Sequence, residues 1–350
     1  MKKENTKNVA TVNSNVATIE LLKKIGYIFI IVAALLILLN FIPSKEVSKN
    51  NFVLESYEKN GVLIMAEAGG YVQNPANTRK AFDAVIKNSS YTDIVELDVR
   101  TSKDGVLVIF GDETINDAAL QPGADPVYIR DTNYDDLVKY NLGNNFVNVE
   151  GTKPYENITS FSSQGLTMLK FEEFLSRYQS SRTSVFYLVD IKETGEAGII
   201  AFNKAVEFLQ DEDYKTFNNR FIFSSEDSDV KDYIASVALK EDSIIHSGGA
   251  GKYTSILVNA LKLGYRQLHT PKYQVVQLSI KEDFILGLKF NLARKGFINR
   301  IEEKNMAIIY TDVETEDEIK VLYSIDAHVI GTGDPKLVDT TIKEIEAENK

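Results

Sequence analysis

Cysteine and tryptophan are absent from this chain of 350 residues. Without cysteine the protein cannot form disulfides, use a thiolate nucleophile or hold a metal through sulfur. Positive charge is also in short supply, because the formal net charge at pH 7 is −11. Proteins that bind nucleic acid neutralise its phosphates with clustered lysines and arginines, so we predict no nucleic-acid partner.

The chain has one long apolar run, from Ile25 to Ile42, and no charged residue lies within it. As a helix this run would be about 27 Å long, close to the roughly 30 Å of a bilayer core. A cleaved signal peptide is the alternative interpretation, but its apolar part is usually only about 7–15 residues long. We therefore predict an uncleaved, single-pass transmembrane signal anchor over residues 25–42.

Two lysines directly precede the predicted anchor. Positive charge next to a span favours the cytoplasmic side, so residues 1–24 are predicted to be a cytoplasmic tail and the rest of the chain to lie outside the cell membrane. Residues 43–60 are predicted to be a polar linker. A folded domain over residues 61–340 follows, and residues 341–350 are the end of its C-terminal helix.

After residue 60, short apolar runs alternate with segments of helical pattern, as is typical of parallel β/α folds. Eight runs are predicted to be strands, at residues 62–67, 94–98, 185–191, 221–224, 243–246, 273–279, 306–310 and 327–331. Eight β/α units predict an α/β fold of the closed (β/α)₈, or TIM-barrel, type. In such barrels the functional groups lie at the C-terminal ends of the strands.

Residues 94–114 are predicted to form a β-hairpin, because an Asp-Gly pair at 104–105 separates two β-prone runs. If these two residues form the turn, Asp98 faces Gly111. The second arm would then be an antiparallel ribbon on the rim of the barrel and not a ninth barrel strand.

Glu96 and Asp98 occupy alternate positions of the first arm and therefore share one face of the strand. A solvated polar face is one interpretation of such a pair. However, the neighbouring residues 94, 95, 97 and 99 are all apolar. An apolar strand that carries paired carboxylates more often indicates a divalent-cation site or an acid–base site.

The order E-L-D-V, a short polar stretch, and then D-G-V-L-V-x-F-x-D-E-T resembles the glycerophosphodiester phosphodiesterase (GDPD) family. The resemblance runs from about Gly61 to Lys336. It implies a phospholipase C-like phosphodiesterase barrel with a loop-rich insertion, here at residues 112–165. It also implies a role in lipid metabolism, since the family hydrolyses glycerophosphodiesters with a divalent cation and two histidines that act as general acid and base.

The resemblance implies a cation site. The E-L-D motif of the family supplies two metal ligands, which match Glu96 and Asp98. A third ligand and a lysine come from a strand that reads V-D-I-K here, so Asp190 replaces a glutamate and Lys192 is kept. The resemblance therefore implies Ca²⁺ or Mg²⁺ on Glu96, Asp98 and Asp190, with Lys192 binding the ligand. A carboxylate-lined pocket that holds only Lys192 is the alternative.

Both histidines of the family pattern are missing. Its A-H-R-G motif reads A-E-A-G here, so Glu67 replaces the histidine and Ala68 the arginine, and its H-D-E motif begins with Gly111. Each acid–base group is typically worth about 10²–10⁴-fold in rate, so we expect hydrolysis by the usual route to be impaired. Without the arginine, the bidentate contact with phosphate oxygens is also lost.

Two side chains are candidates to replace the lost catalytic groups. Glu67 could act as a base, because neighbouring carboxylates raise the pKa of a carboxyl group, or it could equally be a fourth cation ligand. His246 follows a predicted strand, although a structural role is the simpler interpretation. Tyr310 matches the aromatic residue of the W-T-V-N motif of the family, and it is predicted to line the ligand pocket or to belong to the core.

Three functions follow from these residues. The first is a membrane-anchored pseudoenzyme that binds a phosphodiester or lipid headgroup at a divalent-cation site, with hydrolysis impaired. The second is an active phosphodiesterase that uses Glu67 and His246. The third is a non-catalytic scaffold of the cell envelope, whose protein partners the sequence does not identify.

Overall fold

The computed structural model describes residues 20–35, 38, 51–181, 184–217, 219–238, 244–249, 273–283 and 289–348, with backbone only for 244–249, 281–283 and 289–290. Residues 20–35 form a helix. Among the described residues, no helix is long and apolar enough to cross a membrane. The predicted membrane span is therefore not confirmed, and residues 36, 37 and 39–42 of it lie outside the described residues.

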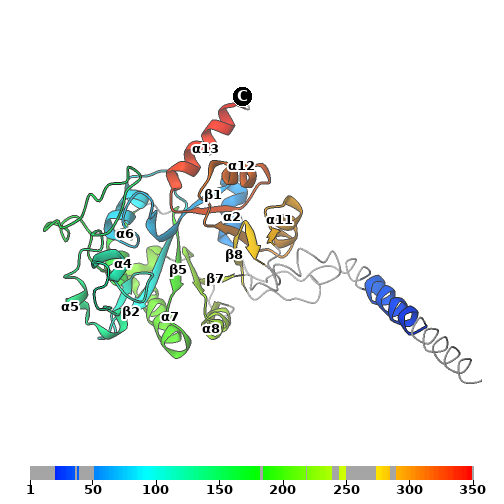
Figure 1. Cartoon of the computed structure of the whole chain (residues 1–350), viewed down its shortest axis with the longest axis horizontal. Helices are drawn as coiled ribbons and strands as arrows, with labels where there is room; N and C mark the ends of the chain where they lie inside the picture. The colour runs from blue at the N-terminus through cyan, green and yellow to red at the C-terminus, as the bar shows by residue number, and fades with distance from the viewer. Residues whose placement is uncertain are drawn as a thin grey trace, which may run out of the picture. The chain divides into compact units, whose positions relative to one another are not determined.

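Eight parallel strands form a closed barrel (Figure 1). In order around the ring they are β1 (Leu63–Ala66), β2 (Ile94–Thr101), β5 (Phe186–Ile191), β6 (Phe221–Ser225), β7 (Ile244–Gly249), β8 (Val275–Ser279), β11 (Ala307–Thr311) and β12 (Val329–Thr332). Each strand pairs in parallel with the next, and β12 pairs with β1 to close the ring. The predicted (β/α)₈ barrel is confirmed, and every barrel strand overlaps one of the predicted runs.

Helices surround the strands on the outside (Figure 1). They are α3 (Arg79–Phe82), which continues as a π-helical turn (Asp83–Lys87), α6 (Phe171–Tyr178), α7 (Gly195–Gln210), α8 (Ser228–Ala238), α11 (Lys295–Glu302), α12 (Glu316–Ser324) and α13 (Pro335–Glu348). Aromatic rings fill much of the layer between strands and helices. Phe174 of α6, for example, packs edge-to-face against Tyr187 of β5, with 5.4 Å between ring centroids.

The interior of the barrel changes from apolar to polar along the strands. Its apolar half is a single cluster, formed by Val53, Leu54, Leu63, Met65, Ile94, Leu188, Ile222, Val275, Ala307, Ile309 and Val329. Side chains two positions further along a strand point the same way, so the next inward positions lie toward the C-terminal ends. Most of these positions are polar, which places a polar cavity above the apolar core.

Residues 43–60 were expected to form a linker, but Phe52–Asn60 form helix α2. Val53 and Leu54 of α2 belong to the apolar cluster inside the barrel. Asn51 caps the helix by accepting a hydrogen bond from the Leu54 amide at 3.2 Å, and its Nδ2 donates to the Gln274 carbonyl at 2.8 Å. The linker prediction is therefore wrong for residues 52–60. The segment looks polar in the sequence because only two of its apolar residues are fully buried against the core.

The predicted hairpin is present, but its register is shifted by one residue. β3 (Leu107–Ile109) pairs with β2 so that Val99 lies opposite Ile109. The loop has three residues, 103–105, and not two, because the Ser102 amide bonds the Val106 carbonyl and Gly105 takes a positive φ of 79°. Asp98 therefore faces Phe110 in the ladder instead of Gly111. The prediction that the second arm is an extra antiparallel ribbon is confirmed, and β4 (Leu169–Lys170) extends it.

The insertion at residues 112–165 carries two short helices, α4 (Asn116–Ala119) and α5 (Tyr134–Leu137), which lie on one side of the barrel (Figure 1). It has a small apolar cluster of its own, formed by Val108, Phe110, Ile115, Ile129, Leu137, Leu142 and Met168. Because Val108 belongs to β3 and Phe110 directly follows it, this cluster fixes the insertion to the rim ribbon.

Candidate active site

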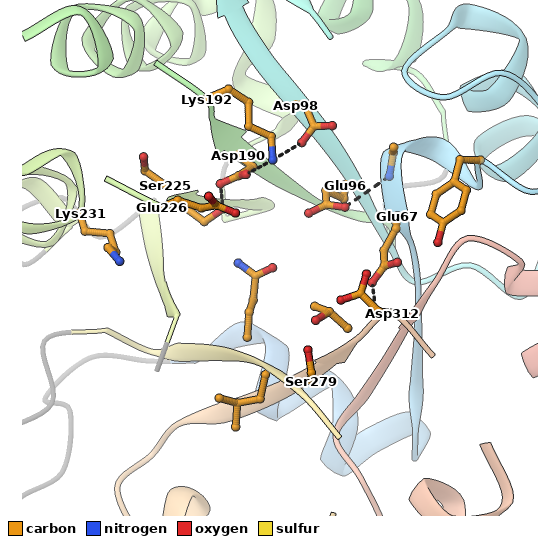
Figure 2. Close-up of a pocket in the computed structure, with 16 residues that line it drawn as sticks. Glu67, Glu96, Asp98, Asp190, Lys192, Ser225, Glu226, Lys231, Ser279 and Asp312 are labelled. Atoms are coloured by element: carbon orange, nitrogen blue, oxygen red, sulfur yellow. Dashed lines mark hydrogen bonds and ion pairs between the residues drawn. The ribbon is translucent and has the colours of Figure 1, made fainter. Parts of the chain in front are cut away.

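A cavity of about 620 Å³ opens at the C-terminal ends of the barrel strands (Figure 2). Six carboxylates line it: Glu67, Glu96, Asp98, Asp190, Glu226 and Asp312. Among the described residues, two cationic side chains line it, Lys192 and Lys231. The cavity is therefore strongly acidic, and it lies where (β/α)₈ barrels carry their functional groups.

Two of these carboxylates form a triad with Lys192, whose Nζ lies 3.0 Å from Asp98 Oδ1 and 2.5 Å from Asp190 Oδ2. Asp98 and Asp190 are neighbours in the register of β2 and β5. Ser224 Oγ donates to Asp190 Oδ1 at 2.6 Å, and Asn77 Nδ2 donates to Asp98 Oδ2 at 2.7 Å. The two carboxylates are thus held in place by one ammonium group and two neutral donors.

Glu67 and Glu96 have no such counter-charge. Glu67 is only 5% exposed, and its Oε1 accepts a hydrogen bond from the Asp312 amide at 2.9 Å. Glu96 Oε2 accepts from the Ala68 amide at 3.3 Å. In the part of the chain that the structure describes, neither glutamate forms a salt bridge, and both face the cavity (Figure 2).

Burial and crowding shift the pKa values of these groups. Burial is the main cause that raises the pKa of Glu67 to about 7. Repulsion by the carboxylates of Asp312 and Asp98 raises this pKa further, whereas the hydrogen bond from the backbone amide of Asp312 lowers it. Burial, followed by repulsion from Asp98 and Asp190, also raises the pKa of Glu96 well above its ordinary value. For Lys192 burial alone would lower the pKa, but the two aspartates together outweigh it and raise the pKa.

The donor set suits a hard cation, because Ca²⁺ and Mg²⁺ prefer carboxylate oxygens. As folded, however, no group of three or more His, Asp or Glu side chains within the described ranges is arranged to hold a metal ion. The Lys192 ammonium lies between Asp98 and Asp190, where a shared cation would otherwise bind. The predicted ligands Glu96, Asp98 and Asp190 therefore meet at one cavity, but they need rotation of their side chains to coordinate one ion.

The two positions expected from the family to carry histidine are both close to this cavity. Glu67 directly follows β1. The absence of a side chain at Gly331 of β12 leaves room for it, since a Cβ at position 331 would lie 2.9 Å from Glu67 Oε1. Gly111 lies against Asp98, because a Cβ at this position would be 2.8 Å from Asp98 Oδ2. A histidine at position 111 would thus require the Asp98 carboxylate to move.

The structure places the other predicted site residues differently. Tyr310 is fully buried, and its hydroxyl donates to the Leu292 carbonyl at 2.9 Å. It does not line the cavity, because its neighbour Ile309 points into the barrel and strand side chains alternate. Tyr310 thus belongs to the core, which corrects its prediction as a ligand-binding residue. His246 lies within β7, opposite Phe223, and its side chain is outside what the structure describes.

Among the residues that sequence reasoning missed are Asn77, which holds a carboxylate of the cavity, and Lys231, which lines the cavity. Asn77 holds Asp98 through two hydrogen bonds, one from its Nδ2 at 2.7 Å and one from the Asp98 amide to its Oδ1 at 3.2 Å. It lies in the stretch Pro-Ala-Asn-Thr at residues 75–78, just before α3. Lys231 lies in the first turn of α8, where nothing in the sequence distinguishes it from a solvated surface lysine.

Comparisons with known proteins agree with this fold. The sequence matches the glycerophosphoryl diester phosphodiesterase family over residues 69–337. No curated protein sequence matches the chain significantly.

Solved structures with similar folds carry related names. The glycerophosphoryl diester phosphodiesterase domain of a Mycobacterium tuberculosis protein is 15% identical, with a TM-score of 0.62, and the match covers 81% of this chain and 100% of that one. An Oleispira antarctica phosphodiesterase in complex with the product sn-glycerol-3-phosphate is also 15% identical, with a TM-score of 0.56, over 82% of this chain and 98% of that one. At these identities the structural similarity establishes the fold alone.

Proposed function

Because this chain belongs to the glycerophosphoryl diester phosphodiesterase family, we propose that its barrel binds a phosphodiester of the lipid-headgroup type together with Ca²⁺ or Mg²⁺. We propose further that hydrolysis by the two-histidine route is impaired. One observation carries this proposal: the carboxylates of Glu96, Asp98 and Asp190 converge on the cavity, while Glu67 and Gly111 stand at the two histidine positions.

The charge of the cavity supports the need for a cation. Six carboxylates and two lysines line it, so a phosphodiester would meet net repulsion there. A divalent cation on the carboxylates would reduce that repulsion and would supply a Lewis acid for the phosphoryl oxygens. Glu96 and Glu67 are better placed to begin binding than Asp98 and Asp190, because Lys192 holds both aspartates whereas neither glutamate forms a salt bridge among the described residues.

Lys231 is the side chain that best fits the anionic group of the ligand. Lys192 is already held by two carboxylates. Lys231 lines the cavity on the side opposite Asp312 (Figure 2), and it forms no salt bridge within the described part of the chain. The phosphoryl oxygens would thus lie between the cation on the acidic wall and the ammonium group of Lys231.

Calorimetric titration of the full chain with sn-glycerol-3-phosphate tests this arrangement. We expect binding in the presence of Ca²⁺ or Mg²⁺, and we expect Lys231→Met to weaken it by about 10- to 100-fold, the value of a charge-assisted hydrogen bond. Lys320→Met is the matched control, because this lysine lies on the exposed face of α12 and its one salt bridge among the described residues is with Glu316. Equal affinities for wild type and Lys231→Met would show that the phosphoryl group binds elsewhere.

A second candidate function is favoured by Glu67. Its buried carboxyl, with a pKa of about 7, is in the range of an effective general acid or base at neutral pH. Cation-dependent turnover of glycerophosphoethanolamine that Glu67→Gln abolishes would establish an active enzyme. Cation-dependent binding without turnover would support the impaired enzyme, and absence of both would favour a scaffold.

We also propose that residues 25–42 anchor the protein in the cell membrane with the barrel outside. The uncharged apolar run and the preceding lysines support this proposal. The full chain should sediment with membranes after washing with alkaline carbonate, and protease added to intact cells should digest the barrel. Recovery of the full chain in the soluble fraction would exclude the anchor.

A further inference from the structure

A second cavity, of about 320 Å³, lies beside the first, between the ends of β1 and β2 and the insertion. Ala68, Tyr71 and Asp98 line both cavities, so the two are neighbours with a shared wall. Small residues keep the second cavity open, since Ala68 and Gly111 both line it. Its volume is at the lower end of the range of small-molecule sites.

The lining of this second cavity combines aromatic rings with carboxylates. The aromatic residues are Tyr71, Phe110 and Phe146, and the acidic residues are Asp98, Asp112 and Asp117. No lysine or arginine is among the described residues that line it. Its charge therefore disfavours an anion, and its aromatic and aliphatic surface is poorly suited to a metal ion, which needs oxygen ligands on several sides.

The amide groups of the cavity are already engaged. Asn77 uses both of its polar atoms on Asp98. Asn145 Nδ2 donates to the Asp117 carbonyl at 3.1 Å and to the Leu120 carbonyl at 2.6 Å, and its Oδ1 accepts from Asn144. The cavity therefore has little capacity to recognise a neutral sugar or polyol. The carboxylates of Asp112 and Asp117 form no salt bridge within the described ranges.

From this lining we propose that the second cavity is a subsite for an organic ammonium group. A cation with an apolar surface gains both from carboxylates and from the faces of aromatic rings. A ligand that spans the shared wall would place its phosphoryl group in the first cavity and its ammonium group in the second. This spanning arrangement rests on the proposed function, and it makes zwitterionic diesters the preferred class of ligand. The ammonium subsite itself does not depend on a metal ion.

Choline and its neutral isostere 3,3-dimethylbutan-1-ol test the subsite directly. They would be titrated into the full chain by NMR in the presence of EDTA, so that no divalent cation takes part. We expect choline to bind about three- to tenfold more tightly than the neutral alcohol, which has the same shape without the charge. Equal affinity for the two probes, or no binding of choline, would overturn the proposal.

Two variants and a control locate the binding. Asp117→Asn and Phe146→Ala should each weaken choline binding about three- to tenfold. Asp125→Asn, another acidic residue of the insertion that does not line the cavity, should leave it unchanged. Choline binding that neither variant weakens lies elsewhere and contradicts the proposal. Retained choline binding without cation-dependent binding of sn-glycerol-3-phosphate would refute the proposed function and leave the ammonium subsite standing.

Discussion

Replacing Lys192 with methionine is expected to lower the free energy of unfolding by about 3–5 kcal/mol in the absence of divalent cations. The substitution leaves Asp98 and Asp190 buried next to each other without the ammonium group that now bridges them. Removing one partner of a buried ion pair is costly, because the remaining charge is neither solvated nor neutralised. Urea unfolding in EDTA at pH 8, with both proteins at the same concentration, measures the difference.

The control for this experiment is Lys343→Met. Lys343 is largely exposed, its side chain being 68% accessible, and it pairs with Asp339 one helical turn away. Pairs whose lysine is this exposed contribute little, so a change of less than about 1 kcal/mol is expected. If Lys192→Met costs no more than this control, then Lys192 does not neutralise the acidic wall.

Addition of Ca²⁺ extends the same experiment. A cation can take the place that the ammonium group leaves between Asp98 and Asp190, so Ca²⁺ should raise the stability of Lys192→Met more than that of the wild type. Binding of Ca²⁺ to the folded state raises the free energy of unfolding by mass action. This increase grows with the logarithm of the Ca²⁺ concentration once that concentration exceeds the Kd for Ca²⁺. An identical response of the two proteins would mean that the cation and Lys192 do not share these carboxylates.

The Glu67 carboxyl is expected to make a pH-dependent contribution of about 3 kcal/mol to the free energy of unfolding, and Glu67→Gln should remove this pH dependence. The pKa of Glu67 is about 7 in the folded protein, against an ordinary value of 4.5. The folded state therefore holds this proton more tightly than the unfolded state. The stabilisation is fully present below pH 4.5, and it is lost as the pH rises through 7.

The measurement is the difference in unfolding free energy between wild type and Glu67→Gln, in EDTA, from pH 5 to pH 8. The wild type should lose stability relative to the variant across this window, because the variant has no proton to release. Glu172→Gln, on the exposed face of α6, serves as the control and should show no such difference. A flat difference curve for Glu67→Gln would mean that this carboxyl is ionised throughout, as in a solvated site.

The barrel was predictable because its signals are local and repeated. Each barrel strand is an apolar run such as Val185–Ile191, and helical segments separate these runs. The errors occur where few residues carry the signal. In α2 only Val53 and Leu54 are fully buried, and in the hairpin one extra loop residue before Val106 changes the register without changing the composition.

The candidate site was predictable in its residues but not in its contacts. From the positions of Glu96, Asp98 and Asp190 near the ends of two predicted strands, the sequence predicted that these side chains lie at one end of the barrel, as they do. The sequence could not show that Lys192 bridges the two aspartates, because that contact depends on the register between β2 and β5. Tyr310 was assigned by motif alone, although its place beside an inward-pointing residue indicates the outer layer.

The central claim is that the acidic wall holds a divalent cation and that this cation recruits a phosphoryl group. It is tested most directly by the affinity of the full chain for sn-glycerol-3-phosphate, with and without Ca²⁺, in wild type and in Glu96→Gln. Glu96 is the informative position because it has no ammonium partner among the described residues. The account predicts cation-dependent binding in the wild type and at least about tenfold weaker binding in the variant. Binding of equal strength in EDTA, or unchanged by Glu96→Gln, would contradict it.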